Sequence, residues 1–173
     1  MLATEPLSKF RECGECSLCC KVVEIEETES PRNEWCKHCD PGKAGCTIHS
    51  ERPDSCRNCD CLWLQGMFDD EHKPDKTGVV FFLWDASAIA HLCLETNGKL
   101  IVGYPDGEVL ERQEAINQIG RIAQHNLVML ADIGIWTLFG PDHLAREAEP
   151  ILQKIANKRG VGFLWLNLSK QSV

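Results

Sequence analysis

Cysteine is distributed very unevenly along this chain of 173 residues, and that distribution constrains the fold more than any other feature. Ten of the 11 cysteines lie between Cys13 and Cys61, and the stretch CGECSLCC, residues 13–20, holds four of them. Three explanations compete: a disulfide framework, redox chemistry between thiols, or a bound metal. An odd number of cysteines and a start, residues 1–12, without the apolar core of a secretory signal disfavour disulfides. We therefore expect metal ligation.

The spacing of the thiols favours ligation but points to two different metals. The run C-x2-C-x2-C over residues 13–19 is typical of iron–sulfur proteins, in which three thiolates hold one side of a cluster. The C-x2-C pairs at 36–39 and 56–59 fit the pattern of a zinc ribbon. Adjacent Cys19 and Cys20 would serve one cluster only with strain. We expect them to face different sites, or one of them to lie behind a ligand. The number of metal sites, one or two, is therefore not fixed by the sequence.

The same residues resemble a known family. The segments GECSLCC, WCKHCDPGKAGC and IHSERPDSCR, within residues 10–62, resemble the CxxCxxCC family of zinc- or iron-chelating proteins, also called the YkgJ-like cysteine-cluster family. The resemblance implies a compact metal centre bound by cysteines and no particular reaction. A flagellin lysine methylase carries a related cluster, so an attached enzyme would follow by analogy only.

Compared position by position, the resemblance implies a set of nine ligands. Six match the family pattern and three stand where related sequences tend to have theirs: Cys13, Cys16, Cys19, Cys20, Cys46 and Cys56, then Cys36, Cys39 and Cys61. Cys59 occupies the place of an aromatic residue and Cys93 lies far along the chain, so we expect neither to be a ligand. His49 replaces a tyrosine and fits a surface position better than a ligand. Arg57, next to Cys56, would either offset thiolate charge or form a surface ion pair.

The amino-acid composition divides the chain into two parts that we expect to form one compact domain. Residues 1–68 are a cysteine-cluster segment with many turn formers and few large apolar side chains, so a metal would have to organise it. Residues 69–173 predict a small α+β unit. The apolar side chains that follow Cys61 are expected to pack against this unit: Trp63, Leu64, Met67 and Phe68.

Hydrophobic patterns predict the elements of that unit. Residues 79–84 indicate a buried strand, and Asn97-Gly98 indicates a hairpin between strands at 91–95 and 99–104, in the first of which Cys93 would be a buried free thiol. Apolar spacing predicts a helix over residues 111–130. A second helix begins near residue 141, with Pro150 expected to kink or split it, and a last strand covers 161–168. The predicted fold is α+β, a metal-organised cysteine segment packed on a small antiparallel sheet with two helices.

Charge and hydropathy restrict the partners. The net charge of −8 and the pI of about 5.2 come with no basic stripe, so we expect no nucleic-acid partner. No apolar run approaches the ~20 residues that span a bilayer, so we expect no membrane partner and a cytoplasmic location.

The sequence therefore predicts a metal-binding protein that holds zinc or an iron–sulfur cluster, with a mainly structural centre that organises a surface for a protein partner. Two alternatives stay open. One is a redox protein or enzyme component that uses a [4Fe-4S] cluster, and the other is metal storage or delivery.

Overall fold

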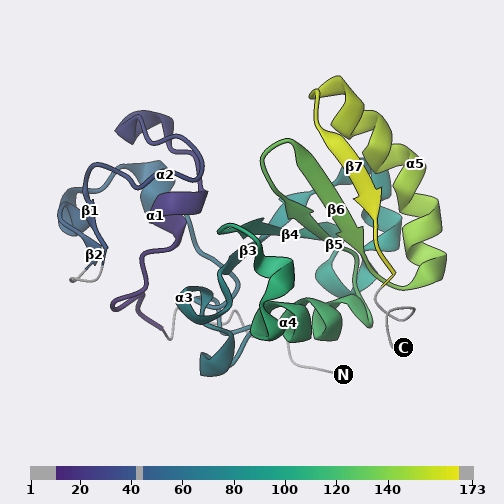
Figure 1. The fold of residues 1–173 in the computed structure, drawn as a ribbon, viewed down its shortest axis with the longest axis horizontal. Helices are drawn as coiled ribbons and strands as arrows, with labels where there is room; N and C mark the ends of the chain where they lie inside the picture. The colour runs from purple at the N-terminus through teal and green to yellow at the C-terminus, as the bar shows by residue number, and fades with distance from the viewer. Residues whose placement is uncertain (1–10, 42–44, 168–173) are drawn as a thin grey trace.

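The computed structural model describes residues 11–41 and 45–167, which form a small cysteine-bearing lobe beside a five-stranded sheet (Figure 1). The strands follow one another across the sheet in sequence order. They are β3 (Val79–Asp85), β4 (Lys99–Pro105), β5 (Val128–Ala131), β6 (Ile135–Phe139) and β7 (Gly162–Trp165). The predicted buried strand at 79–84 is confirmed as β3, and the last predicted strand is confirmed as the shorter β7.

The sheet is mixed, not antiparallel as predicted. Strands β3 and β4 pair antiparallel, as do β5 and β6, whereas β4 pairs parallel with β5 and β6 pairs parallel with β7. Helix α4 (Gln113–Ala123) connects β4 to β5, and α5 (Asp142–Lys158) connects β6 to β7. A crossover through a helix returns the chain in the same direction, so each β-α-β unit produces a parallel pair.

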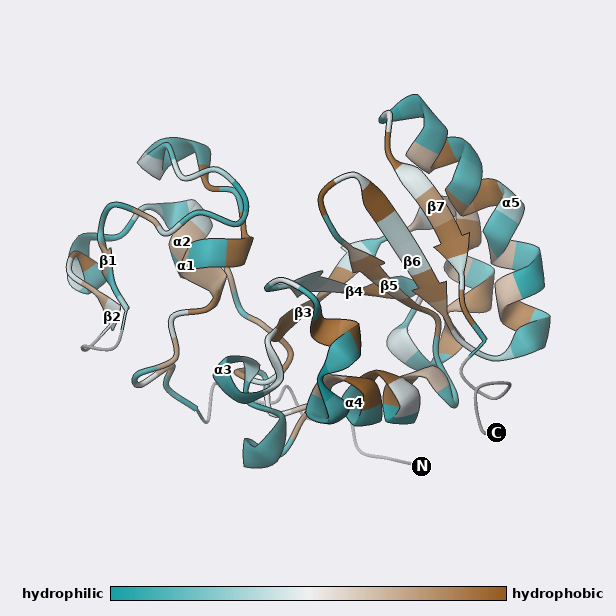
Figure 2. Cartoon of the chain, viewed as in Figure 1, coloured by the Kyte–Doolittle hydropathy of each residue, from teal (hydrophilic) through white to brown (hydrophobic). Residues whose placement is uncertain are grey.

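Helices cover both faces of this sheet, and successive strand residues alternate between the two cores (Figure 2). In β4, Leu100 and Val102 pack with α5, while Ile101 between them packs with α4. In β5, Met129 and Ala131 face the α5 side, and their neighbours face α4. Within the described residues, no helix is both long and apolar enough to cross a membrane.

The predicted helix over residues 111–130 is wrong in its second half. Helix α4 ends at Ala123, and residues 128–131 form β5. All four residues of β5 are buried, because both of its faces are covered. A strand buried on both sides has no polar alternation, and its Leu130 therefore fitted the helical spacing by chance.

The predicted strand at 91–95 is also wrong. This region forms two 3-10 turns, η4 (Ser87–Leu92) and η5 (Leu94–Thr96), within the long connection from β3 to β4. Asn97 and Gly98 do adopt left-handed backbone, with φ of 53° and 80°, as the turn signal required. Cys93 is confirmed as a buried free thiol, but it lies between the turns and not in a strand.

The cysteine lobe contains only short elements, none longer than four residues: α1 (Cys19–Val22), η1 (Glu26–Thr28), β1 (Cys39–Asp40), β2 (Gly45–Cys46), η2 (His49–Glu51) and α2 (Asp54–Arg57). Three more short helical segments join the lobe to the sheet or precede α4: η3 (Asp70–His72), α3 (Pro74–Thr77) and η6 (Val109–Glu111). Strands β1 and β2 pair antiparallel, with Cys39 opposite Cys46. Regular structure therefore contributes little to the order of this lobe.

Apolar and polar contacts attach the lobe to β3 and β4. Leu18 and Val22 are buried against Val80. Lys21 forms an ion pair with Asp106 at 2.7 Å, at the turn after β4. These contacts place α1 directly over one end of the sheet.

A basic side chain of the lobe reaches further across the sheet. Arg32 donates a hydrogen bond to the carbonyl oxygen of Ala131 in β5. Its guanidinium stacks 4.7 Å from the ring centre of Tyr104. The lobe is therefore held at more than one point along the sheet.

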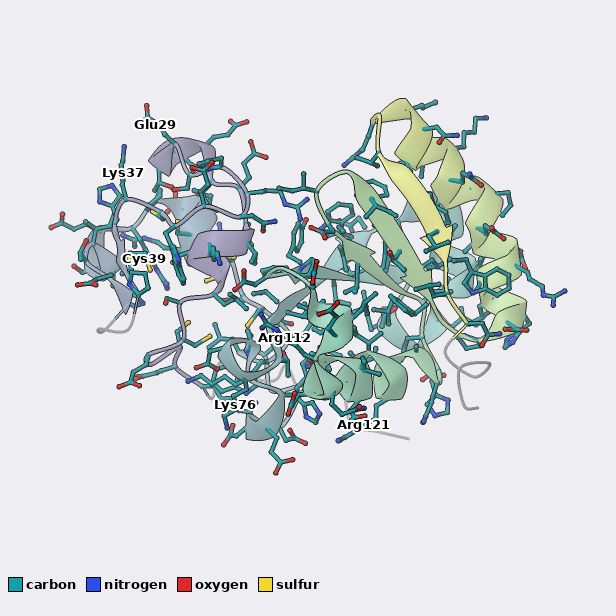
Figure 3. All side chains as sticks on the ribbon, viewed as in Figure 1. Glu29, Lys37, Cys39, Lys76, Arg112 and Arg121 are labelled. Atoms are coloured by element: carbon teal, nitrogen blue, oxygen red, sulfur yellow. The ribbon has the colours of Figure 1, made fainter. Side chains whose placement is uncertain are left out.

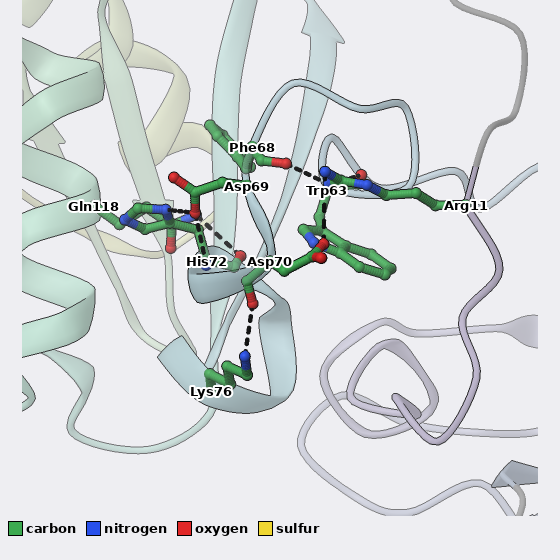
Figure 4. A network of polar contacts seen from close by, with 8 residues as sticks. All are labelled: Arg11, Trp63, Phe68, Asp69, Asp70, His72, Lys76 and Gln118. Carbon is green, nitrogen blue, oxygen red and sulfur yellow. Dashed lines mark hydrogen bonds and ion pairs between the residues drawn. The ribbon is translucent and has the colours of Figure 1, made fainter.

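The prediction that the segment after Cys61 packs on the sheet is confirmed in part. Trp63 is buried, Leu64 is half-buried, and Phe68 meets the edge of Phe81 at 5.8 Å between ring centres. Arg11 donates hydrogen bonds to the carbonyl oxygens of Trp63 and Phe68 and fixes this turn (Figure 4). Met67, predicted to be covered, is 45% exposed.

Helix α5 runs without interruption through Pro150, which was predicted to kink or split it. Proline lacks the N–H that would bond to the carbonyl oxygen one turn earlier, and its ring crowds that carbonyl. Packing of the buried face, Ala145, Ala148, Leu152 and Ala156, holds the helix together in spite of this defect.

Replacing Pro150 by alanine should therefore stabilise the protein. Pro150 is exposed, so no packing is lost, and we expect a gain of about 1–2 kcal/mol after allowing for the freer unfolded chain. Urea unfolding measures it. The exposed Gln153→Ala variant of the same helix should change the free energy of unfolding by less than about 0.5 kcal/mol. A destabilised Pro150→Ala variant would contradict this account of α5.

Candidate metal centre

Backbone turns position the thiols in pairs. In three of the four C-x2-C pairs, the amide of the second cysteine donates to the carbonyl oxygen of the first, at 3.0 Å for 13–16, 2.9 Å for 36–39 and 3.3 Å for 56–59. A further bond of 2.9 Å from the Cys36 amide to the Cys20 carbonyl oxygen ties two of these stretches together. The local sequence thus forms the knuckles that metal ligation requires, and tertiary contacts bring them into one lobe (Figure 3).

The thiols gather around two small neighbouring cavities. The larger thiol cavity has a volume of about 50 Å³ and is lined by Cys19, Cys20, Cys36, Cys46, Cys56 and Cys59. The smaller thiol cavity has a volume of about 20 Å³ and is lined by Cys13, Cys16, Cys19, Cys59 and Cys61. Cys19 and Cys59 border both cavities, so the two are separated by little more than these two side chains.

Eight of the nine predicted ligands line one of these cavities. The ninth, Cys39, forms a hydrogen bond with Cys20 and so stands beside the larger cavity. Cys20 faces only the larger cavity, whereas Cys19 faces both, which accords with different roles for these adjacent thiols. Cys93 lies apart, in the core beneath α5.

Cys59 was predicted not to be a ligand, but it lies among the thiols that line the two cavities. Its thiol hydrogen-bonds with Cys19 and borders both cavities. The signal was present in the C-x2-C pair at 56–59, which the zinc-ribbon pattern includes and the family pattern does not. The exclusion of Cys59 rested on the resemblance alone.

The surroundings of most thiols keep them protonated. Burial raises the pKa of Cys61 to about 11 and also raises the pKa of Cys16. For Cys20, a hydrogen bond with Cys19, followed by burial, raises the pKa far above its usual value. Burial outweighs a hydrogen bond from Ser17 and raises the pKa of Cys39 to about 11. At neutral pH a metal cation that bound these sulfur atoms would displace their protons to water.

Cys36 is the exception. Burial would raise its pKa, but a hydrogen bond from Ser30 and one from the backbone N–H of His38, 3.5 Å from the sulfur, prevail. The pKa of Cys36 is lowered as a result. Hydrogen bonds to sulfur stabilise the thiolate, which is the form that binds metal.

The arginine beside the thiols is Arg52 rather than Arg57, and Lys37 and Lys73 also lie near thiols of the cluster. Arg52 lines the larger cavity, and its charge lowers the pKa of Cys13 against the stronger effect of burial, which raises it. Arg57 donates hydrogen bonds to the carbonyl oxygens of Arg52 and Ser50, at 2.7 and 3.1 Å. Arg57 therefore braces the turn that carries Arg52, and His49 is exposed on the same turn, as predicted.

The thiols stand close together but are not arranged as ligands. Among residues 11–41 and 45–167, no three His, Cys, Asp or Glu side chains form a group that could hold a metal ion, and no disulfide links the cysteines. Instead the thiols hydrogen-bond to one another: Cys19 with Cys20 and Cys59, and Cys20 with Cys39. Soft sulfur donors are the ligand type that zinc and iron–sulfur clusters take in proteins.

Comparison with known proteins adds no family. No protein-family model, no curated protein and no solved structure matches this chain. The resemblance to the cysteine-cluster family therefore stays a prediction.

Proposed function

We propose that this protein binds a metal centre, zinc or an iron–sulfur cluster, through the cysteine lobe, and that the centre is mainly structural. The observation that carries the proposal is the pair of adjoining thiol cavities that share Cys19 and Cys59. Ten thiols supply enough donors for two sites of four ligands each, without water or substrate. A centre closed by protein ligands holds a fold rather than catalysing a reaction.

The poor apolar content of the lobe supports a structural role. Between residues 11 and 61, the large apolar side chains that are buried are Leu18 and Val22, and both serve to attach the lobe to the sheet. The rest of the lobe, including the β1–β2 pair, has no hydrophobic core of its own among the described residues. Metal binding would then provide folding free energy, as in other small metal-dependent lobes.

An exposed aromatic residue of the lobe supports an interaction role. Trp35 is 41% exposed, and its ring centre lies 5.6 Å from the ammonium of Lys21, which also pairs with Asp106 at the turn after β4. An aromatic side chain held by a cation on a metal-organised surface is the kind of anchor that protein partners use. A redox role or metal delivery would use the same thiols. The identity and amount of bound metal distinguish these alternatives from a structural role.

Metal analysis of protein purified without oxygen tests the proposal directly. Elemental mass spectrometry, together with the visible absorption spectrum, identifies the centre. One or two zinc ions per colourless chain would support the structural role. Brown protein with stoichiometric iron and sulfide would support the redox alternative. Protein purified intact with neither metal, and unable to take up either, would reject the proposal.

Single Cys→Ser variants should separate ligands from bystanders. We expect Cys19→Ser and Cys59→Ser to lower the metal content by at least about half, because each removes a thiol from both cavities. Cys93→Ser is the matched control, with full metal content and a loss of stability on the order of 1 kcal/mol. Full metal content in both Cys19→Ser and Cys59→Ser would contradict the shared-wall arrangement.

Chelation should disorder the lobe before the sheet. Amide hydrogen exchange after metal removal should accelerate within residues 13–61 and stay slow in β4, β5 and β6, which lie in the two hydrophobic cores. Equal protection of the lobe with and without metal would show that the centre does not organise it.

A further inference from the structure

A third cavity lies away from the thiols and is not explained by metal binding. Its volume of about 470 Å³ falls within the range of small-molecule sites. Residues of η3, η5, β4 and α4 line it, and none of the cysteines does. Its apolar lining consists of Met67, Phe68, Ile101 and Ile122.

Gln118 of α4 makes this cavity a candidate binding site. The residue is only 2% exposed, and its Nε2 donates a long hydrogen bond of 3.4 Å to the carbonyl oxygen of His72. Its Oε1 is buried and has no hydrogen-bond partner among the described residues. A buried acceptor without a donor destabilises the fold, so a ligand N–H that reached it from the cavity after a small rotation of the side chain would satisfy it.

Asp69 lines the same cavity and adds a negative charge to it (Figure 4). Its carboxylate pairs with Nδ1 of His72 and accepts the backbone N–H of His72 at 3.2 Å. The hydrogen bond with His72 lowers the pKa of Asp69, so the carboxylate is ionised at neutral pH. A neutral acceptor and a carboxylate in the same cavity suit an ammonium group, which carries a positive charge and three donors.

Arg121 supplies a positive charge on the same side of α4. It stands three residues after Gln118, a spacing that places two helical side chains about 5–6 Å apart. It forms no ion pair with any described residue and lines the cavity, where its guanidinium can bind a carboxylate through two hydrogen bonds. Glu95 also lines the cavity and disfavours a ligand that carries only negative charge.

We propose that this cavity binds a free α-amino acid with a large apolar side chain. The ammonium group meets Gln118 Oε1 and Asp69, the carboxylate meets Arg121, and the side chain covers the apolar lining. Amino and carboxyl groups on one carbon match the short spacing between Gln118 and Arg121 on the helix. The site is independent of the metal centre.

Calorimetric titration of the full chain with L-phenylalanine and L-leucine tests the ligand class. Three analogues each lack one recognised group: 2-phenylethylamine lacks the carboxylate, 3-phenylpropionate lacks the ammonium group, and glycine lacks the apolar side chain. Each should bind at least about tenfold more weakly than L-phenylalanine. Equal binding of either phenyl analogue would overturn the proposal, as would failure of both amino acids to saturate the protein at 10 mM.

Variants locate the site. Gln118→Met keeps the side-chain volume and removes the orphan acceptor, so we expect unchanged or higher thermal stability and about tenfold weaker binding of L-phenylalanine. Arg121→Gln changes an exposed position and should weaken binding similarly. Arg146→Gln, an exposed arginine of α5, is the control and should bind normally. Normal affinity in Gln118→Met or in Arg121→Gln would refute the assignment.

Discussion

Burial of Leu18 and Val22 against Val80 is the contact on which the cysteine lobe depends. Each such side chain contributes about 1.5–3 kcal/mol when removed from water, whereas ordering each residue of a chain costs about 1–2 kcal/mol. Two buried side chains can therefore anchor a lobe but cannot order some forty residues of loop. What remains must come from polar contacts, such as the ion pair of Lys21 with Asp106, and from whatever the thiols bind.

Because so few apolar side chains order the lobe, its stability depends on the state of its thiols. Seven of the ten clustered thiols have a raised pKa, because burial and neighbouring thiols oppose their ionisation. A soft cation would relieve that opposition by replacing several protons at once, and Arg52, which lines the larger thiol cavity, would offset part of the remaining negative charge. The hydrogen bonds around Cys36 already favour a thiolate there.

The segment that follows Cys61 links the thiols to the rest of the protein. Cys61 and Trp63 border the smaller thiol cavity, and a few residues later Met67, Asp69 and His72 border the cavity beneath α4. Arg11 holds the turn between them through two carbonyl oxygens. The same loop therefore positions side chains at both candidate sites, on a sheet made rigid by burial of both faces.

The sequence by itself determined the local features. It set the knuckle turns of the cysteines, the buried strand β3, the starts of both long helices and the turn at Asn97-Gly98, because hydrophobic spacing and turn chemistry act over a few residues. Only the tertiary structure decided the parallel pairings, the identity of β5 as a strand, and the continuity of α5 through Pro150. The same holds for Cys59 between the cavities and for Gln118 facing the cavity beneath α4. These depend on which segments meet across the sheet, and no local pattern encodes a contact between residues far apart in the chain.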